Sequence, residues 1–270
     1  MNFRSTIWLS AAFLVLLLAA AIGAPWLTPY AAEGAGAPHL AHKLLSPSWA
    51  HPFGTDEMGR DLLARIFYGA RTSLALAALV IGGSVTLGAL VGLIAGAAGG
   101  WVDEFVMRIT DIFLAFPPLL FAILLVSVLG GGFASAVLAL GLAWWPLYAV
   151  LVRGEVVRLR GLPFVEAARS IGASPWRIAS RHLLPNALGP LLVQATVDVG
   201  AVILVASGLS FIGLGPQPPA ADWGAMINSG RQFVLSGSWW VAGFPSLAIL
   251  LTALAFATLG DGLRATAGPR

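Results

Sequence analysis

Very few side chains in this sequence are placed where they could carry out chemistry, and Asp198 is the foremost of them. It is the one carboxylate deep inside a long apolar run, and an ionisable residue inside a membrane span is a functional candidate by default. Such a group could serve a proton relay or, with a second aspartate, an intramembrane aspartyl protease. Asp111 is the only conceivable second aspartate, and it lies close to the end of another apolar run. The alternative is a buried Asp198 that forms hydrogen bonds to neighbouring helices.

Three of the four histidines, His39, His42 and His51, fall in a polar stretch near the N-terminus. Imidazole binds first-row metals, but no carboxylate or thiolate stands at a supporting spacing, so we interpret them as solvated loop residues and expect no metal. The sequence has no Cys, no phosphate-binding Walker A segment, no Ser-His-Asp framework and no zincin motif. We therefore expect no catalytic residue and no cofactor, and predict that the chain is not an enzyme.

The densest group of charges lies between Arg153 and Asn186, where six arginines accompany two glutamates. The arginines are at positions 153, 158, 160, 169, 177 and 181. The order of residue types within this basic segment predicts a helix, a turn and a second helix. Gly172 suits the left-handed conformation that ends a helix. Ser174 and Pro175 then suit the N-cap and the first position of the next one.

The second of these helices is expected to end at Pro185. Trp176, Ala179 and Leu183 fall at i, i+3 and i+7, which places them on one face of a helix. A basic helix–turn–helix also resembles a DNA-reading unit, which would make the chain a membrane-tethered regulator. A DNA-binding unit normally needs a third helix for its core, and the apolar runs on both sides leave no room for one. Docking to a protein at the membrane surface fits this segment better.

The composition places all of these groups in a membrane protein. Of 270 residues, 58% are hydrophobic and 10% are charged, whereas a soluble domain carries about 25% charged residues. About six apolar runs are long enough to cross a bilayer. They cover residues 7–27, 74–98, 109–129, 134–152, 187–214 and 239–259. We therefore predict an all-α polytopic membrane protein with about six transmembrane helices.

Details of these runs add further expectations. Residues 54–71 are amphipathic and predict a helix that lies along the membrane face and leads into the next span. Residues 99–108 predict a short turn, and prolines 117 and 118 interrupt the third run. Glycines 88, 92 and 96 follow the small-xxx-small pattern of closely packed membrane helices. The run from Ile7 to Leu27 is either a retained span or a cleaved signal peptide, and its length favours the span.

Orientation follows from the distribution of basic residues. About six spans place both termini and the basic segment on one side of the membrane. Because the basic segment carries six arginines, the positive-inside rule predicts that this side is cytoplasmic. The polar stretch from Thr28 to Thr72 then lies outside, although it carries Lys43 and three arginines.

Several stretches resemble a known family. Glu166-Ala167-Ala168, Gly172 and Leu184-Pro185 resemble the EAA loop of ABC-transporter permeases, whose coupling helix inserts into a groove of the cytoplasmic ATPase. Further stretches, which together extend from about His51 to Arg264, resemble permeases of the dipeptide/oligopeptide/nickel importer family. They are His51–Asp61, Ala115-Phe116-Pro117, Arg181–Asn186, Leu209–Gly215, Pro218-Pro219, Asp222-Trp223-Gly224 and Gly260–Arg264.

The resemblance implies a permease subunit in the bacterial inner membrane, which forms half of a pathway for peptides, nickel or another small solute. The implied partners are a second homologous permease, two cytoplasmic ATPase subunits, a substrate-binding protein outside, and membrane lipid, with no nucleic acid. The residues implied to couple to the ATPase are Glu166, Ala167, Ala168, Gly172, Ser174, Pro175, Trp176, Arg177, Arg181, Leu184 and Pro185.

The implied domain organisation has three parts. An N-terminal span with an outer loop covers residues 1–72, a transmembrane domain covers 73–264 with the coupling loop at 153–186, and a tail covers 265–270. Two positions depart from the family pattern. Ala206 stands where a Glu is usual before the Leu-Ser-Phe segment, and Ala257 stands where an Asn is usual near the end of the last span. Neither change affects the expected fold.

Overall fold

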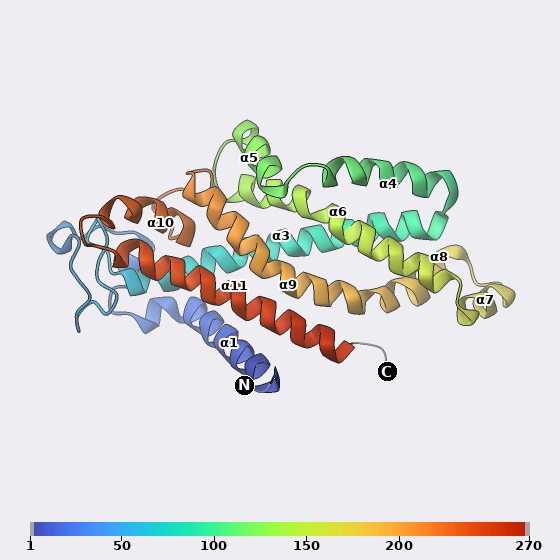
Figure 1. Ribbon diagram of the computed structural model, residues 1–270, viewed down its shortest axis with the longest axis horizontal. Coiled ribbons are helices and arrows are strands. Elements are labelled where there is room, and N and C mark those ends of the chain that lie inside the picture. The colour runs from blue at the N-terminus through green and yellow to red at the C-terminus, as the bar shows by residue number, and fades with distance from the viewer. Residues whose placement is uncertain (1–2, 268–270) are drawn as a thin grey trace.

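The computed structural model describes residues 3–267, and every regular element in them is helical. Five long helices lie side by side along the molecule (Figure 1). They are α1 (Phe3–Leu27), α3 (Leu62–Ala98), α6 (Phe133–Arg160), α9 (Leu184–Phe211) and α11 (Trp240–Ala267). The shorter elements are α2 (Ala31–Ala35), η1 (Leu40–His42), α4 (Gly100–Leu114), α5 (Pro118–Leu129), α7 (Pro163–Ser170), α8 (Pro175–Ile178), η2 (Ala179–Leu183), α10 (Trp223–Gly230) and η3 (Arg231–Phe233). The predicted all-α class is confirmed.

The sixth span is a broken one. Helices α4 and α5 pass the length and apolarity criteria only as a pair, and they are bent by 86° where they meet. Pro117 has no N–H and its ring excludes a preceding helical turn, while Pro118 starts α5. The expected turn over residues 99–108 is wrong, because the positive φ angles of Gly99 and Gly100 reverse the chain within two residues and α4 starts at once.

Helix α3 is longer than the sequence indicated. It starts at Leu62, where the Asp61 carboxylate caps it by accepting from the Ala64 N–H, and it continues for 37 residues. The helix expected over residues 54–71 is confirmed from Leu62 onward, where it leads into the next span, and is wrong for residues 54–61, which are not helical. The expected domain boundary near residue 72 falls inside α3. At 1.5 Å per residue α3 is about 55 Å long, well beyond the roughly 30 Å of bilayer hydrocarbon.

Helix α1 is attached to α3 through Arg71. Pro25 lies inside α1 and has no N–H, which leaves the Ala21 carbonyl without its usual donor within the helix. The Arg71 guanidinium donates to the Ala21 carbonyl through Nε and to the Ile22 carbonyl through Nη2. A basic side chain of α3 thus satisfies the backbone that the proline disturbs.

The remaining long helices form two closely packed pairs. In the α3–α6 pair, a β-carbon at Gly88 would lie 2.6 Å from the Trp145 carbonyl oxygen, and Gly92 and Gly96 face the same helix. The predicted packing role of these three glycines is confirmed. In the α9–α11 pair, a β-carbon at Gly200 would lie 2.9 Å from the Ala253 carbonyl oxygen. Helix backbones can approach this closely only where the side chain is absent.

Candidate functional site

The connecting segment, which we define as residues 161–186, joins α6 to α9 at one end of the bundle (Figure 1). Its first helix, α7, ends in a Schellman turn. Gly172 has a φ of +78°, its N–H donates to the Arg169 carbonyl at 2.9 Å, and the Ala173 N–H donates to the Ala168 carbonyl at 3.0 Å. Ser174 then caps α8 by accepting from the Arg177 N–H. The predicted helix, turn and helix are confirmed.

The second helix does not end at Pro185. A π-helical turn, η2, follows α8 and leads directly into α9, so that residues 175–211 form one helical span. Pro185 lies in the first turn of α9. Its missing N–H is tolerated there because the widened turn before it has already displaced the regular hydrogen-bond pattern. The connecting segment is therefore continuous with a membrane-spanning helix.

The buried face of this helix does not include Trp176. Ala179 and Leu183 are buried against the bundle, whereas Trp176 is 73% exposed and the nearby Ile171 is 86% exposed. The expectation that Trp176, Ala179 and Leu183 line one face is therefore wrong for Trp176, which lies in the first turn of α8 and points to solvent. Two large apolar side chains lie free on the surface of the connecting segment, a feature typical of interaction sites.

The six arginines of the basic segment fall into two groups. Three lie on α6 and bind within the molecule: Arg153 pairs with Asp103 at 2.7 Å, Arg158 pairs with Glu155, and Arg160 donates to the Gly96 carbonyl. The implied coupling loop at 153–186 is thus shortened, because residues 153–160 are the last turns of α6. Arginines 169, 177 and 181 and Glu166 are exposed, and the salt bridges found in the described part of the chain include none of them.

Asp198 is buried where three helices meet. Its Oδ2 accepts from the Tyr148 hydroxyl of α6 at 2.8 Å, and its Oδ1 accepts from Gln194 Nε2 of α9 at 2.9 Å. Arg264 of α11 donates to Gln194 Oε1 at 3.2 Å and extends the cluster. Asp198 is therefore the hydrogen-bonded buried carboxylate that the sequence allowed as one alternative, and its side-chain hydrogen-bond partners among the described residues are Tyr148 and Gln194 and no second aspartate. Asp111 is exposed on α4.

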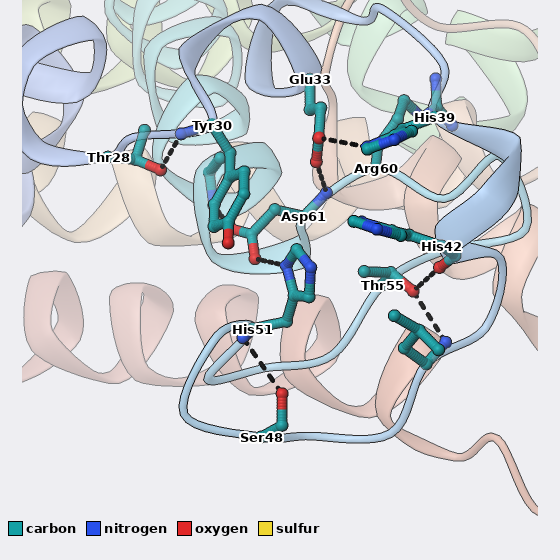
Figure 2. A network of polar contacts seen from close by, with 12 residues as sticks. Thr28, Tyr30, Glu33, His39, His42, Ser48, His51, Thr55, Arg60 and Asp61 are labelled. Atoms are coloured by element: carbon teal, nitrogen blue, oxygen red, sulfur yellow. Dashed lines mark hydrogen bonds and ion pairs between the residues drawn. The ribbon is translucent and has the colours of Figure 1, made fainter.

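A second polar network lies at the opposite end of the molecule, in residues 28–61, which we call the polar cap (Figure 2). Asp61 accepts from His51 Nδ1 at 2.9 Å and caps α3, and its own N–H donates to Glu33 Oε2 at 2.8 Å. Glu33 Oε1 lies 3.2 Å from His39 Nδ1. The interpretation of solvated histidines is wrong for His51, which is 3% exposed.

The rings of the three histidines contact one another in a row, one pair tilted and the other edge-on, and do not converge on a point. The centroids of His39 and His42 are 3.9 Å apart, and those of His42 and His51 are 5.4 Å apart. Residues 3–267 contain no group of three or more His, Cys, Asp or Glu side chains arranged to hold a metal ion.

The polar cap and the start of α3 are joined to the rest of the bundle by buried donors. Arg65 of α3 is 4% exposed and donates through Nη1 to the Gly34 carbonyl of the cap at 3.4 Å and to the Pro219 carbonyl at 2.9 Å. Trp223 Nε1 donates to the Ile66 carbonyl at 3.1 Å. Burial raises the pKa of Asp222, which caps α10 beside them. Sequence reasoning missed this network, although Asp61 directly before a long apolar run was a visible N-cap signal.

Comparison with known proteins explains the arrangement. A family model described as "Binding-protein-dependent transport system inner membrane component" matches residues 88–270. The chain belongs to this family. The permease is thus a multi-pass inner-membrane transport component and not an enzyme, as the resemblance implied.

Curated relatives agree with the family. The permease is 43% identical over 261 residues to the "Probable D,D-dipeptide transport system permease protein DdpC" of Escherichia coli K12. This alignment covers 97% of this chain and 86% of that protein. It is 43% identical over 260 residues to the "Glutathione transport system permease protein GsiD" of Pectobacterium atrosepticum, with 96% and 85% covered. An inward-facing crystal structure of the MetNI methionine ABC transporter shares the fold, with a TM-score of 0.62, 20% identity, and 77% and 98% of the two chains covered.

These findings give no support to the two alternatives that the sequence left open. The permease family is a transport component, and Asp198 is bonded to Tyr148 and Gln194 in place of a second aspartate. The connecting segment passes from α8 through η2 into α9, with no third helix to complete a DNA-reading unit. The main interpretation, a permease subunit of an ABC importer, is confirmed.

Proposed function

We propose that this permease moves short peptides inward and that its connecting segment couples the movement to ATP hydrolysis by a partner protein. It works with a second homologous permease, two ATPase subunits and a substrate-binding protein. The relatives that support this cargo are named for transport of D,D-dipeptides, glutathione and dipeptides. What these solutes share is a short peptide, so a short peptide is the proposed cargo, ahead of nickel or another small solute.

The observation that carries the coupling role is the free surface of the connecting segment. Trp176 and Ile171 are exposed among the unpaired charges of Glu166, Arg169 and Arg177. An exposed aromatic side chain surrounded by charge is typical of a site that a partner covers. The proposed coupling set is Glu166, Ala167, Ala168, Gly172, Ser174, Pro175, Trp176, Arg177, Arg181, Leu184 and Pro185. Within it, Ala168 and Gly172 shape the turn, Ser174 and Pro175 start α8, and Trp176 and the charges contact the partner.

We further propose that the connecting segment and both termini are cytoplasmic and that the polar cap lies outside. Unpaired arginines of the connecting segment support this orientation through the positive-inside rule, whereas Arg60 and Arg65 of the other end are bound within the molecule. Helix α1 is proposed to be retained, because Arg71 binds its backbone and α1 packs against α11.

A labelling experiment tests the orientation and the docking role together. The chain has no Cys, so a single cysteine reports without background. Ser170→Cys on the connecting segment should stay unlabelled by an impermeant thiol reagent in intact cells, react in inside-out vesicles, and become protected when the ATPase subunits are present. Ser48→Cys on the polar cap is the control and should react from outside regardless of the ATPase. Labelling of Ser170→Cys in intact cells would contradict both proposals.

A further inference from the structure

The two helix pairs are connected to each other unevenly along their length. At the polar-cap end they are joined by several buried donors, among them Arg65, Trp223 and Trp240, whose Nε1 donates to the Thr55 carbonyl at 3.3 Å. Among the described side chains, one hydrogen bond crosses directly between the long helices of the α3–α6 pair and those of the α9–α11 pair. It is the bond from Tyr148 to Asp198.

This bond is sealed from water and has no competing partner. Tyr148 is fully buried and Asp198 is 6% exposed. Both carboxylate oxygens are occupied, because Gln194 Nε2 binds the one that Tyr148 leaves free. A buried acceptor that loses its donor is costly, so the bond favours the arrangement of helices in which it forms.

The bond lies on the helix that continues from the connecting segment. Residues 175–211 form one span, and Asp198 follows Trp176 by about 22 residues, or about 33 Å along a helix. On the other side of Asp198, glycine packing ties α9 to α11, since a β-carbon at Gly260 would lie 3.1 Å from the Val197 backbone nitrogen. A displacement of the connecting segment is therefore carried along α9 to the Tyr148–Asp198 bond, and α11 moves with it.

We propose that the Tyr148–Asp198 bond is a positioning contact that opposes movement of the α9–α11 pair against the α3–α6 pair. It is formed in this conformation and breaks when the ATPase displaces the connecting segment. Because it must be broken for the movement, it suppresses hydrolysis that is not accompanied by transport. This inference rests on the proposed function, since it takes the connecting segment to be the place where the ATPase acts.

The test uses the complete transporter with its ATPase, second permease and binding protein in proteoliposomes, and measures ATP hydrolysis and peptide uptake side by side. Tyr148→Phe removes the hydroxyl and keeps the ring. We expect basal hydrolysis to rise about three- to tenfold, the range that interhelical hydrogen bonds in membranes support. Stimulation by the loaded binding protein should fall, and more ATP should be consumed for each peptide.

Two substitutions of the acceptor sharpen the test. In Asp198→Asn the amide oxygen can still accept from Gln194 while the amide nitrogen donates to the Tyr148 hydroxyl, so coupling should stay near that of the wild type. Asp198→Ala should raise basal hydrolysis as much as Tyr148→Phe does. The double variant should show no further rise, because both substitutions remove the same bond. If Tyr148→Phe does not accumulate, the two Asp198 variants decide. Equal ratios of ATP consumed to peptide transported in Asp198→Asn and Asp198→Ala would overturn the inference, and a higher ratio in Asp198→Ala would support it.

Ser84→Ala is the matched control. Ser84 is buried and donates to the Gly141 carbonyl at 3.0 Å, which is an intramembrane hydrogen bond within the α3–α6 pair. Its loss should leave the ratio of ATP consumed to peptide transported unchanged. A wild-type ratio in Tyr148→Phe, or an equal change in Ser84→Ala, would overturn the inference and leave the proposed function intact. A wild-type complex without substrate-stimulated hydrolysis would contradict the proposed function itself.

Discussion

The polar cap and the connecting segment are both rich in charged residues, yet they use them in opposite ways. In the polar cap, Glu33, Asp56 and Asp61 are buried, and each accepts hydrogen bonds from neighbours in the cap or the start of α3. In the connecting segment, Glu166, Arg169 and Arg177 are exposed and join none of the salt bridges among the described residues.

The charges of the polar cap therefore stabilise the fold, whereas those of the connecting segment are available to bind a partner. A buried carboxylate with all of its oxygens bonded stabilises one conformation, and its loss strands the donors around it. An exposed charge contributes little to stability and remains available for binding. Substitutions in the polar cap should therefore lower the amount of folded permease, and substitutions in the connecting segment should lower its activity.

The largest expected effect on stability comes from Asp61→Ala. It removes the N-cap of α3 and leaves His51 Nδ1 and the Ala64 N–H without their acceptor. We expect a loss of about 2–4 kcal/mol, the sum of a missing cap and a stranded buried donor. Thermal unfolding in detergent and the amount of protein in the membrane measure it. Wild-type values for both would mean that the cap is not a cooperative unit.

Gly172→Val is expected to have an intermediate effect. A β-branched residue at a φ of +78° costs about 1–2 kcal/mol, but no atom beyond the two neighbouring residues of the chain lies within 4 Å of the added β-carbon. The turn should therefore change its angle while the bundle stays folded, so uptake should be lost at near-normal abundance. Gly172→Asn is the control, because Asn tolerates the left-handed region, and it should keep most uptake. Full uptake by Gly172→Val would make the connecting segment a passive linker.

Trp176→Ala should change stability by less than about 0.5 kcal/mol, since its side chain is exposed. Its binding role should still be visible. Loss of an aromatic anchor at an interface typically costs about 2 kcal/mol or more, or about a thirtyfold weaker association. Titration of the ATPase onto membranes that carry the variant measures this change. An unchanged affinity would place the contact elsewhere on the segment.

Glu166→Ala is the smallest of these perturbations. It removes one exposed charge and keeps the Schellman turn, so both stability and abundance should match the wild type. Uptake should fall less than in Gly172→Val. The difference in uptake between Glu166→Ala and the wild type should become smaller at high salt, because salt screens the charge interaction that the wild type still has. An effect on uptake as severe as that of Gly172→Val would assign Glu166 a role beyond a single charged contact.

The features that the sequence predicted are those determined by residues close together in the chain. The turn at Gly172, the cap at Ser174 and the packing of Gly88, Gly92 and Gly96 all depend on residues close in the chain or on a simple repeat. The polar cap escaped prediction because its bonds join positions as distant as Glu33 and Asp61, and no periodicity marks such pairs. The 86° bend also escaped, since prolines indicate where a helix breaks and not how far it turns.

The Tyr148–Asp198 contact lies between these cases. The sequence identified Asp198 as the buried carboxylate, but its donor lies 50 residues away on a different helix. Tyr148 sits in an apolar run where an aromatic residue is unremarkable in composition, so nothing in the sequence alone connected the two.

The π-helical turn at residues 179–183 has a consequence for how the chain can vary. Such a turn holds one residue more than the α-helical turn it replaces, and an α-helix advances about 100° per residue. The lower rotation per residue of the π-turn takes up this extra residue, so α8 and the spanning helix keep nearly the phase of a regular helix. Deleting a single residue within the turn would restore a regular α-helix and leave Trp176 near its present orientation, whereas the same deletion in a regular part of α9 would turn everything before it by about 100°.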